Sequence, residues 1–149
     1  TQFIVMEIKH ITELEALEFV KKQNHKDKWH DDFHMWRKHL IILANKWPQL
    51  KQFYRGAGKW LGYFDKELKG VYWYNISGDE IYDGYLISSK PGAGIKLGRY
   101  LENNIIWKRN WSLCNEKHIK FNKRLGFEVK DTGKINDREV FLLWRQKKY

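Results

Sequence analysis

Two glycines one residue apart form a turn that can bind an anion. Residues 89–94 read Ser-Lys-Pro-Gly-Ala-Gly and join a β-branched, hydroxyl-rich run to a segment with helical apolar spacing. Glycines let successive backbone N–H groups approach a ligand closely, and the dipole at a helix N-terminus favours negative charge. The pattern therefore predicts a phosphate-binding turn at the start of a helix.

Two nucleotide-binding motifs of known spacing do not fit this turn. A Walker A motif needs Gly-Lys-Ser/Thr, but Gly94 is followed by Ile95. The dinucleotide fingerprint needs G-x-G-x-x-G, whereas Gly92, Gly94 and Gly98 are one residue too widely spaced, and an antiparallel meander is expected before them. Neither a P-loop nor a Rossmann site is predicted.

A second motif follows within residues 115–129, which read NEKHIKFNKRLGFEV. Together, the two motifs resemble the GNAT superfamily of N-acyltransferases, which transfer an acyl group from a coenzyme A thioester to an amine. In that family, Gln/Arg-x-x-Gly-x-Gly/Ala precedes a leucine three residues on, and Asn, Ala, Tyr and Gly-Phe come later. Here Leu97 stands at the leucine position. The later spacing is matched by Asn115, His118, Asn122 and Gly126-Phe127. The sequence of this segment is most similar to the GNAT-like proteins of tailed phages.

The resemblance implies that acetyl-CoA or coenzyme A binds along the glycine turn. Backbone N–H groups of residues 92–95 would hold its pyrophosphate, and the strand edge near residues 86–88 would pair with its pantetheine arm. Ser89 replaces the family's Gln/Arg, and Lys90, Lys96 and Arg99 can compensate for it electrostatically. The implied cofactor-binding residues are Leu86, Ile87, Ser88, Lys90, Gly92, Ala93, Gly94, Ile95, Lys96 and Asn115.

Acyl transfer to an amine needs a base, an oxyanion donor and an acid for the leaving thiolate. Glu80 and Asp83 lie where related enzymes often place a carboxylate base. Asn122 occupies the family's tyrosine position and cannot donate a proton as a phenol does. His118, one helical turn earlier, is a substitute with a pKa suited to proton transfer. The predicted catalytic residues are therefore Glu80, Asp83, His118 and Asn122.

Two other groups of residues resemble a metal site and a nucleophile, but their spacing supports neither. His30-Asp31-Asp32-Phe33-His34 imitates the H-E-x-x-H zinc motif, but aspartate reaches less far than glutamate and no third ligand is evident. No metal is therefore expected. Cys114 adjoins Asn115, but the spacing shows no partner that would make it a nucleophile.

The elements that must position these residues follow from periodicity. Residues 3–8 predict a strand. Thr12 and Glu15 form a capping-box pattern that predicts a helix to about residue 22. The apolar stripe from Trp29 to Trp47 predicts a second helix. Strands are expected at 59–64, 70–76, 81–88, 111–114, 127–129 and 140–144, and further helices after the glycine turn and at 116–125.

This order predicts an α+β (mixed α/β), GNAT-like fold. The expected central sheet is twisted and mostly antiparallel, with six to seven strands and helices on both faces, in the order β-α-α-β-β-β-α-β-α-β-β. The length of 149 residues and the lack of a linker favour one domain over residues 1–149. No apolar run approaches a membrane span, and the single cysteine fits a reducing compartment, so a cytoplasmic monomer or homodimer is expected, in the host cytoplasm if the protein is phage-encoded.

Charge is distributed unevenly along the chain and leaves three functions open. Residues 1–89 carry 13 Lys and Arg against 12 Asp and Glu, whereas residues 90–149 carry 15 against 6. The second half is expected to attract a polyanion, either a nucleotide cofactor or a nucleic acid, although solubility alone also explains a basic face.

The first function is an acyl-CoA-dependent N-acyltransferase with an unknown amine acceptor. The alternatives are a GNAT that modifies a DNA base or tRNA, and an inactive, binding or virion-associated GNAT fold.

Overall fold

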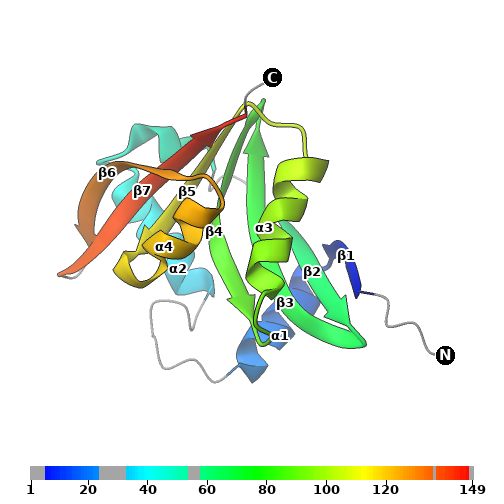
Figure 1. Cartoon of the computed structure of the whole chain (residues 1–149). Coiled ribbons are helices and arrows are strands. Elements are labelled where there is room, and N and C mark those ends of the chain that lie inside the picture. Colours follow the sequence, from blue (N-terminus) through cyan, green and yellow to red (C-terminus); the bar gives the residue numbers. More distant parts are fainter. Residues whose placement is uncertain (1–5, 24–32, 54–57, 136, 148–149) are drawn as a thin grey trace.

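The computed structural model describes residues 6–23, 33–53, 58–135 and 137–147 and contains a seven-stranded sheet (Figure 1). Its order is β1-β2-β3-β4-β5-β7-β6, and among the described strands the pair of β4 and β5 alone is parallel. The strands are β1 (Met6–Ile11), β2 (Lys59–Asp65), β3 (Glu67–Ser77), β4 (Glu80–Ser88), β5 (Arg109–Asn115), β6 (Glu128–Ile135) and β7 (Arg138–Gln146).

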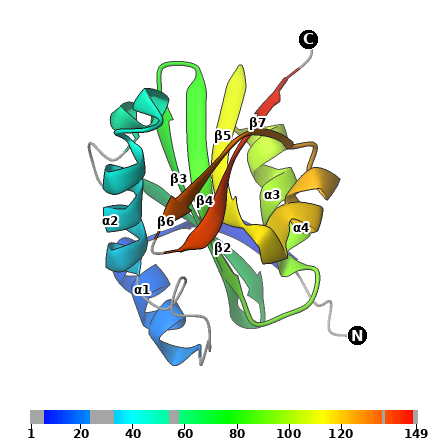
Figure 2. The same ribbon diagram turned by 90° about the vertical axis from the view of Figure 1, so that its left-hand side faces the viewer.

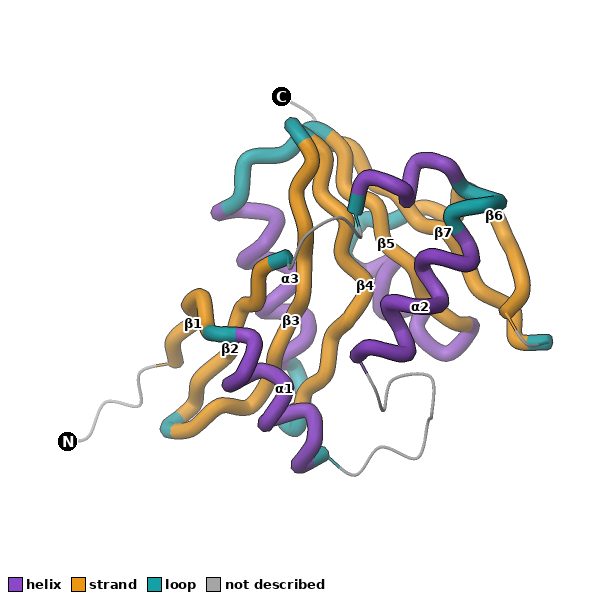
Figure 3. Tube along the Cα trace, turned by 180° about the vertical axis from the view of Figure 1, so that it is seen from behind, coloured by secondary structure: helices purple, strands orange, loops and turns teal. Residues whose placement is uncertain are grey.

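Helices cover both faces of the sheet, as Figures 2 and 3 show from two sides. Helices α1 (Glu13–Lys22) and α2 (Phe33–Leu43) lie on one face, and α3 (Ala93–Asn104) and α4 (Ile119–Arg124) lie on the other. Two 3₁₀ turns, η1 (Pro48–Gln52) and η2 (Glu116–His118), connect them to the strands. The predicted mixed α/β class, the mostly antiparallel sheet and the element order are confirmed.

The first helix begins where its capping pattern predicts. The Thr12 side chain accepts a hydrogen bond from the Glu15 N–H, and the Glu15 side chain accepts one from the Thr12 N–H. The strand before it runs over Met6–Ile11 and is offset from the predicted 3–8, of which residues 3–5 lie outside the described residues.

The predicted helix over 116–125 is split into η2 and a short α4. The Asn115 side chain accepts from the Lys117 N–H and so caps a 3₁₀ turn rather than an α-helix. At the other end, the N–H groups of Leu125 and Phe127 both donate to the Asn122 carbonyl, and Gly126 adopts a φ of 92°. A left-handed glycine at this position ends a helix.

Aromatic side chains form the core between the sheet and α2. The Phe33 ring lies 4.8 Å from that of Trp60, and the Trp36 ring lies 5.4 Å from those of Trp73 and Tyr85. The predicted stripe is confirmed for its described members, which are all buried: Phe33, Trp36, Leu40, Leu43 and Trp47. Rings packed at these distances add to the free energy gained by burying their area.

Truncation of Trp36 tests the role of this core. Trp36 is 0% exposed, so Trp36→Ala is expected to lower the free energy of unfolding by about 3–5 kcal/mol, because the lost ring leaves a cavity. Urea denaturation measures the change. Leu14→Ala is the control: Leu14 is 68% exposed and should change stability by less than about 0.5 kcal/mol. Equal losses in the two variants would contradict the packing described.

Candidate active site

Strands β4 and β5 pair along only part of their length. Their parallel register runs from Glu80 opposite Arg109 to Asp83 opposite Ser112 and then stops. Gly84 is an extra residue in β4, since Trp73 of β3 faces Tyr85 while Tyr74 faces Asp83. A Cβ on Gly84 would lie 3.2 Å from the Leu113 backbone N and O. Because Gly84 has no side chain, its backbone can lie close to Leu113 just after the last paired residue of β4.

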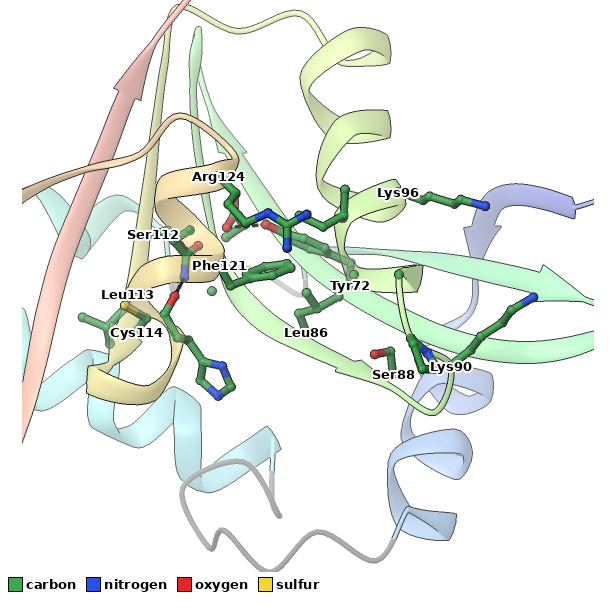
Figure 4. Close-up of a pocket in the computed structure, with 18 of the residues that line it drawn as sticks. Tyr72, Leu86, Ser88, Lys90, Lys96, Ser112, Leu113, Cys114, Phe121 and Arg124 are labelled. Carbon is green, nitrogen blue, oxygen red and sulfur yellow. Dashed lines mark hydrogen bonds between the residues drawn. The ribbon is translucent and has the colours of Figure 1, made fainter.

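A cavity of 880 Å³ lies in this opening. Figure 4 shows its walls: Leu86 and Ser88 come from β4, Ser112 and Leu113 from β5, and Phe121 and Arg124 from α4. Beyond Asp83, the edge of β4 that faces β5 has no strand partner among the described residues. Its backbone amides and carbonyls are therefore available to pair with an extended ligand.

The N-terminus of α3 lies at one end of the cavity. Gly92 is its N-cap, has a φ of 84° and makes no side-chain capping bond. The first N–H groups of a helix have no partner within the helix, so they can donate to an anion. In α3 the Ala93 N–H is already used, because it donates to the Lys90 carbonyl at 3.2 Å. Gly94 keeps this end open, because a Cβ there would lie 3.0 Å from Leu86 Cδ2 and 3.2 Å from Phe121 Cζ.

Most of the predicted cofactor-binding residues line one cavity. Ile87 and Ala93 do not: they are 3% and 1% exposed and pack into hydrophobic clusters on opposite faces of the sheet. Asn115 is also buried outside the lining and caps η2. The residues brought together are Leu86, Ser88, Lys90, Gly92, Gly94, Ile95 and Lys96.

The lysine ammonium groups near the turn are directed away from the helix N-terminus. The ammonium of Lys90 forms an ion pair with Asp65, which lowers the pKa of the Asp65 carboxyl. Lys96 Nζ lies 3.3 Å from Met6 Sδ and 5.7 Å from the centroid of the Tyr63 ring. Figure 4 shows both side chains extending away from β5, whereas Arg124 lies over the opening. Arg124 is a cavity cation that the sequence motifs did not single out.

The two predicted carboxylates lie in different surroundings. Glu80 does not line the cavity; its carboxylate lies 3.4 Å from Arg109 Nε and accepts a hydrogen bond from Trp111. Asp83 lines the cavity and is 0% exposed. Desolvation raises the pKa of its carboxyl above the usual value, although hydrogen bonds from Tyr72, Asn110 and Ser112 and the charge of Arg145 oppose this effect.

The predicted acid positions lie on the wall formed by η2 and α4. His118 is an exposed side chain that lines the cavity, and Asn122 is 7% exposed. The Asn122 amide donates to the His118 carbonyl at 2.8 Å. It also hydrogen-bonds Cys114, which lowers the pKa of the thiol, but burial has the larger effect and raises this pKa to about 12. A role in catalysis for either residue stays a prediction.

Tyr72 is a cavity residue that sequence reasoning missed. Its hydroxyl donates to Asp83 Oδ1 at 2.6 Å, and the residue is 3% exposed. The sequence predicted a strand over residues 70–76, which contains Tyr72, but assigned this tyrosine no role. Its proximity to Asp83 depends on the register of β3 against β4, which no local motif encodes.

The zinc-like motif cannot be placed, because residues 30–32 lie outside the described residues. Within the described part of the chain, no group of three His, Cys, Asp or Glu side chains is arranged to hold a metal ion. No helix in the same ranges is both long and apolar enough to cross a membrane.

Alkylation of Cys114, the single cysteine, tests the burial of the β5 wall. A thiol pKa raised from 9.0 to about 12 leaves roughly a thousandfold less thiolate at pH 7, so iodoacetamide should modify the folded protein at least that much more slowly than free cysteine. Mass spectrometry measures the modification. The denatured protein should react at the ordinary rate, and ordinary reactivity in the native protein would contradict this environment.

Comparisons with known proteins give a consistent fold. No protein-family profile and no curated protein matches the sequence. A GNAT-family acetyltransferase from Bacillus cereus is similar in structure, with a TM-score of 0.63, 13% identity and coverage of 97% of this chain and 99% of that one. The ribosomal-protein-S18-alanine N-acetyltransferase from Escherichia coli has a TM-score of 0.62, 12% identity and coverage of 95% and 94%. A spermidine N-acetyltransferase chimera from Vibrio cholerae and hSSAT has a TM-score of 0.59, 15% identity and coverage of 95% of each chain. The chain therefore has the fold of GNAT acetyltransferases.

Proposed function

We propose that this protein is an N-acyltransferase that moves an acetyl group from coenzyme A to an amine by direct attack in a ternary complex. The observation that carries the proposal is the opening between β4 and β5, with the N-terminus of α3, which has no side-chain cap, at one end. The solved structures of similar fold include enzymes named for spermidine and for a ribosomal-protein alanine, both of which present an amine.

The diphosphate of coenzyme A fits the first turn of α3. Gly92 and Gly94 present backbone N–H groups without a side chain in the way, and a Cβ on Gly92 would meet nothing within 4 Å. The helix dipole and these donors favour an anion. Arg124 adds a positive charge at the cavity wall, since it lines the cavity and is exposed.

The pantetheine arm fits the open edge of β4 beyond Asp83. This arm is an extended chain with two amides, and the unpaired edge offers matching donors and acceptors. With the diphosphate at α3, the thioester would reach the point where β4 and β5 separate. A backbone N–H at that point can stabilise the oxyanion that forms when the amine attacks.

Asp83 is the predicted carboxylate that lies at this point. It lines the cavity, whereas Glu80 is ion-paired with Arg109 outside the lining. A raised pKa brings a carboxylate closer to the range of a general base. The role of Asp83 as base is therefore part of the proposal.

The basic surface beside the cavity is relevant to which acceptor the protein uses. Lys117, Lys120, Lys123 and Arg124 are exposed within one stretch that contains no acidic residue. These charges fit a polyphosphate cofactor, and they equally fit the alternative of a nucleic-acid acceptor.

Calorimetry with acetyl-CoA and coenzyme A tests the proposal, followed by a free-thiol assay with a panel of spermidine, an alanine-initiated peptide, tRNA and DNA. The expected result is saturable binding of acetyl-CoA and amine-dependent release of thiol. Failure to bind acetyl-CoA would favour an inactive GNAT fold. Tight, salt-sensitive association with DNA or RNA would favour the nucleic-acid-directed alternative.

Gly94→Val should weaken the binding of acetyl-CoA by about tenfold or more, because its branched side chain fills the floor of the cavity between Leu86 and Phe121. Asn103→Val is the matched control, since it places the same side chain at an exposed position near the other end of α3. Calorimetry measures the affinities, and thermal unfolding confirms that both variants fold. Unchanged affinity in a folded Gly94→Val protein would contradict the proposed position of the cofactor.

A further inference from the structure

A buried hydroxyl and carboxylate meet where β4 and β5 separate. The Tyr72 O–H donates to Asp83 Oδ1 at 2.6 Å, and both residues line the cavity. Tyr72 is 3% and Asp83 is 0% exposed, so bulk water does not compete for this hydrogen bond.

The position of the pair follows from strand register. Asp83 is the last residue of β4 that pairs with β5, and Tyr72 of β3 lies opposite Leu86 in the part of β4 that β5 leaves open. The Tyr72 side chain belongs to the hydrophobic cluster on the α3 face of the sheet. The pair therefore lies at the apex of the opening, on the face where the helix N-terminus lies. Figure 4 shows Tyr72 in this position.

Aminolysis of a thioester requires a proton to leave the amine nitrogen and another to reach the departing sulfur. Both atoms are bonded to the same carbon in the tetrahedral intermediate, so one phenol oxygen can reach both in turn. Asn122, at the family's tyrosine position, cannot serve, because its amide already donates to the His118 carbonyl and does not exchange a proton as a phenol does.

Resting on the acyltransferase activity proposed above, we propose that Tyr72 and Asp83 form a proton shuttle between the attacking amine and the leaving sulfur. As the new C–N bond forms and the carbonyl electrons move to oxygen, the Tyr72 oxygen accepts a proton from nitrogen while the Tyr72 proton passes to the Asp83 carboxylate. As the C–S bond breaks and the carbonyl re-forms, Tyr72 donates its proton to sulfur and Asp83 returns one to Tyr72. Both side chains end as they began, and the products are an amide and a free thiol.

The surroundings of Asp83 suit this exchange. Asn110 Nδ2 donates to Asp83 Oδ2 at 2.7 Å, and the Arg145 Nε donates to Asn110 Oδ1 at 2.9 Å. These bonds fix the carboxylate, and its position is tied to four neighbouring strands. Burial raises the pKa of Asp83, so the carboxylate takes up a proton more readily than an exposed one, and the pKa of Tyr72 is raised as well, so the phenol stays neutral at rest.

Two other candidates for these proton transfers are less suitably placed. Glu80 does not line the cavity and lies 3.4 Å from the guanidinium of Arg109. His118 lines the cavity but is exposed and lies in η2, after β5 has ended. Tyr72 and Asp83 are the titratable pair that is buried and in direct hydrogen-bond contact at the apex.

Tyr72→Phe tests the shuttle, because it removes one hydroxyl and keeps the ring. Turnover is measured by thiol release with the amine that the panel identifies, and binding is measured by calorimetry with acetyl-CoA. The expected result is a loss in kcat of about 10²–10⁴-fold, with acetyl-CoA affinity within about threefold of wild type. Tyr74→Phe is the matched control: it removes a hydroxyl from the same strand and sheet face, but its partner is His10 outside the cavity, and it should leave kcat within about threefold.

Asp83→Asn and the double variant Tyr72→Phe/Asp83→Asn separate a shared shuttle from two independent roles. Residues that act as one unit lose activity non-additively, so the double variant should be about as slow as the slower single variant. Multiplication of the two losses would overturn the shuttle, as would Tyr72→Phe turnover equal to wild type. A wild-type protein that releases no thiol with any amine would instead overturn the acyltransferase proposal itself, and the shuttle with it.

Discussion

The candidate site depends on one constraint: β4 and β5 are held together at Asp83 and Ser112 and no further. Side chains from four adjacent strands meet at this level, in the order Tyr72, Asp83, Asn110 and Arg145. Before this level the strands pair in parallel, and beyond it they separate around the cavity. The polar network therefore lies at the level where the pairing of β4 and β5 stops and the opening begins.

The network places two opposite charges in the interior. Arg145 is 5% exposed and donates to the Leu125 carbonyl at 2.6 Å, and its guanidinium lies 4.5 Å from the centroid of the Phe127 ring. Taking a carboxylate and a guanidinium out of water is costly, and such pairs often stabilise a protein no better than apolar residues would. Their use here is to fix geometry: β7 and the end of α4 are tied to the strands that form the cavity wall. The same burial that makes the carboxylate costly also makes it readier to accept a proton.

Much of the fold could be predicted from the sequence, since its signals are local. The Thr12 capping box and the glycine turn before α3 have the structure that their patterns predict. The aromatic stripe is buried as predicted, but α2 ends at Leu43, so the predicted helix to Trp47 is too long by its last turn. The split of 116–125 into η2 and a short α4 could not be foreseen. It depends on the Asn115 cap and on two N–H groups that share the Asn122 carbonyl.

The cavity lining was predicted where residues belong to a recognisable motif, as in the glycine turn and at His118 and Asn122. Seven of the ten predicted cofactor-binding residues line the cavity, whereas Ile87 and Ala93 point into the core because side chains alternate along a strand and helix α3 packs its own face. Tyr72, Ser112 and Arg124 come from three separate elements and meet through sheet register and helix docking. The raised pKa of the Asp83 carboxyl likewise follows from burial, which composition does not reveal.

The central claim is that backbone groups between β4, the glycine turn and β5 receive an acyl-CoA thioester. A ¹⁵N NMR titration of the protein with acetyl-CoA tests it most directly, because each amide reports separately. The account predicts saturable shifts that are largest at Gly92, Gly94 and Ile95 and along residues 84–88. Shifts that fail to saturate, or that are confined to strands such as β1 or β6 away from the opening, would contradict it.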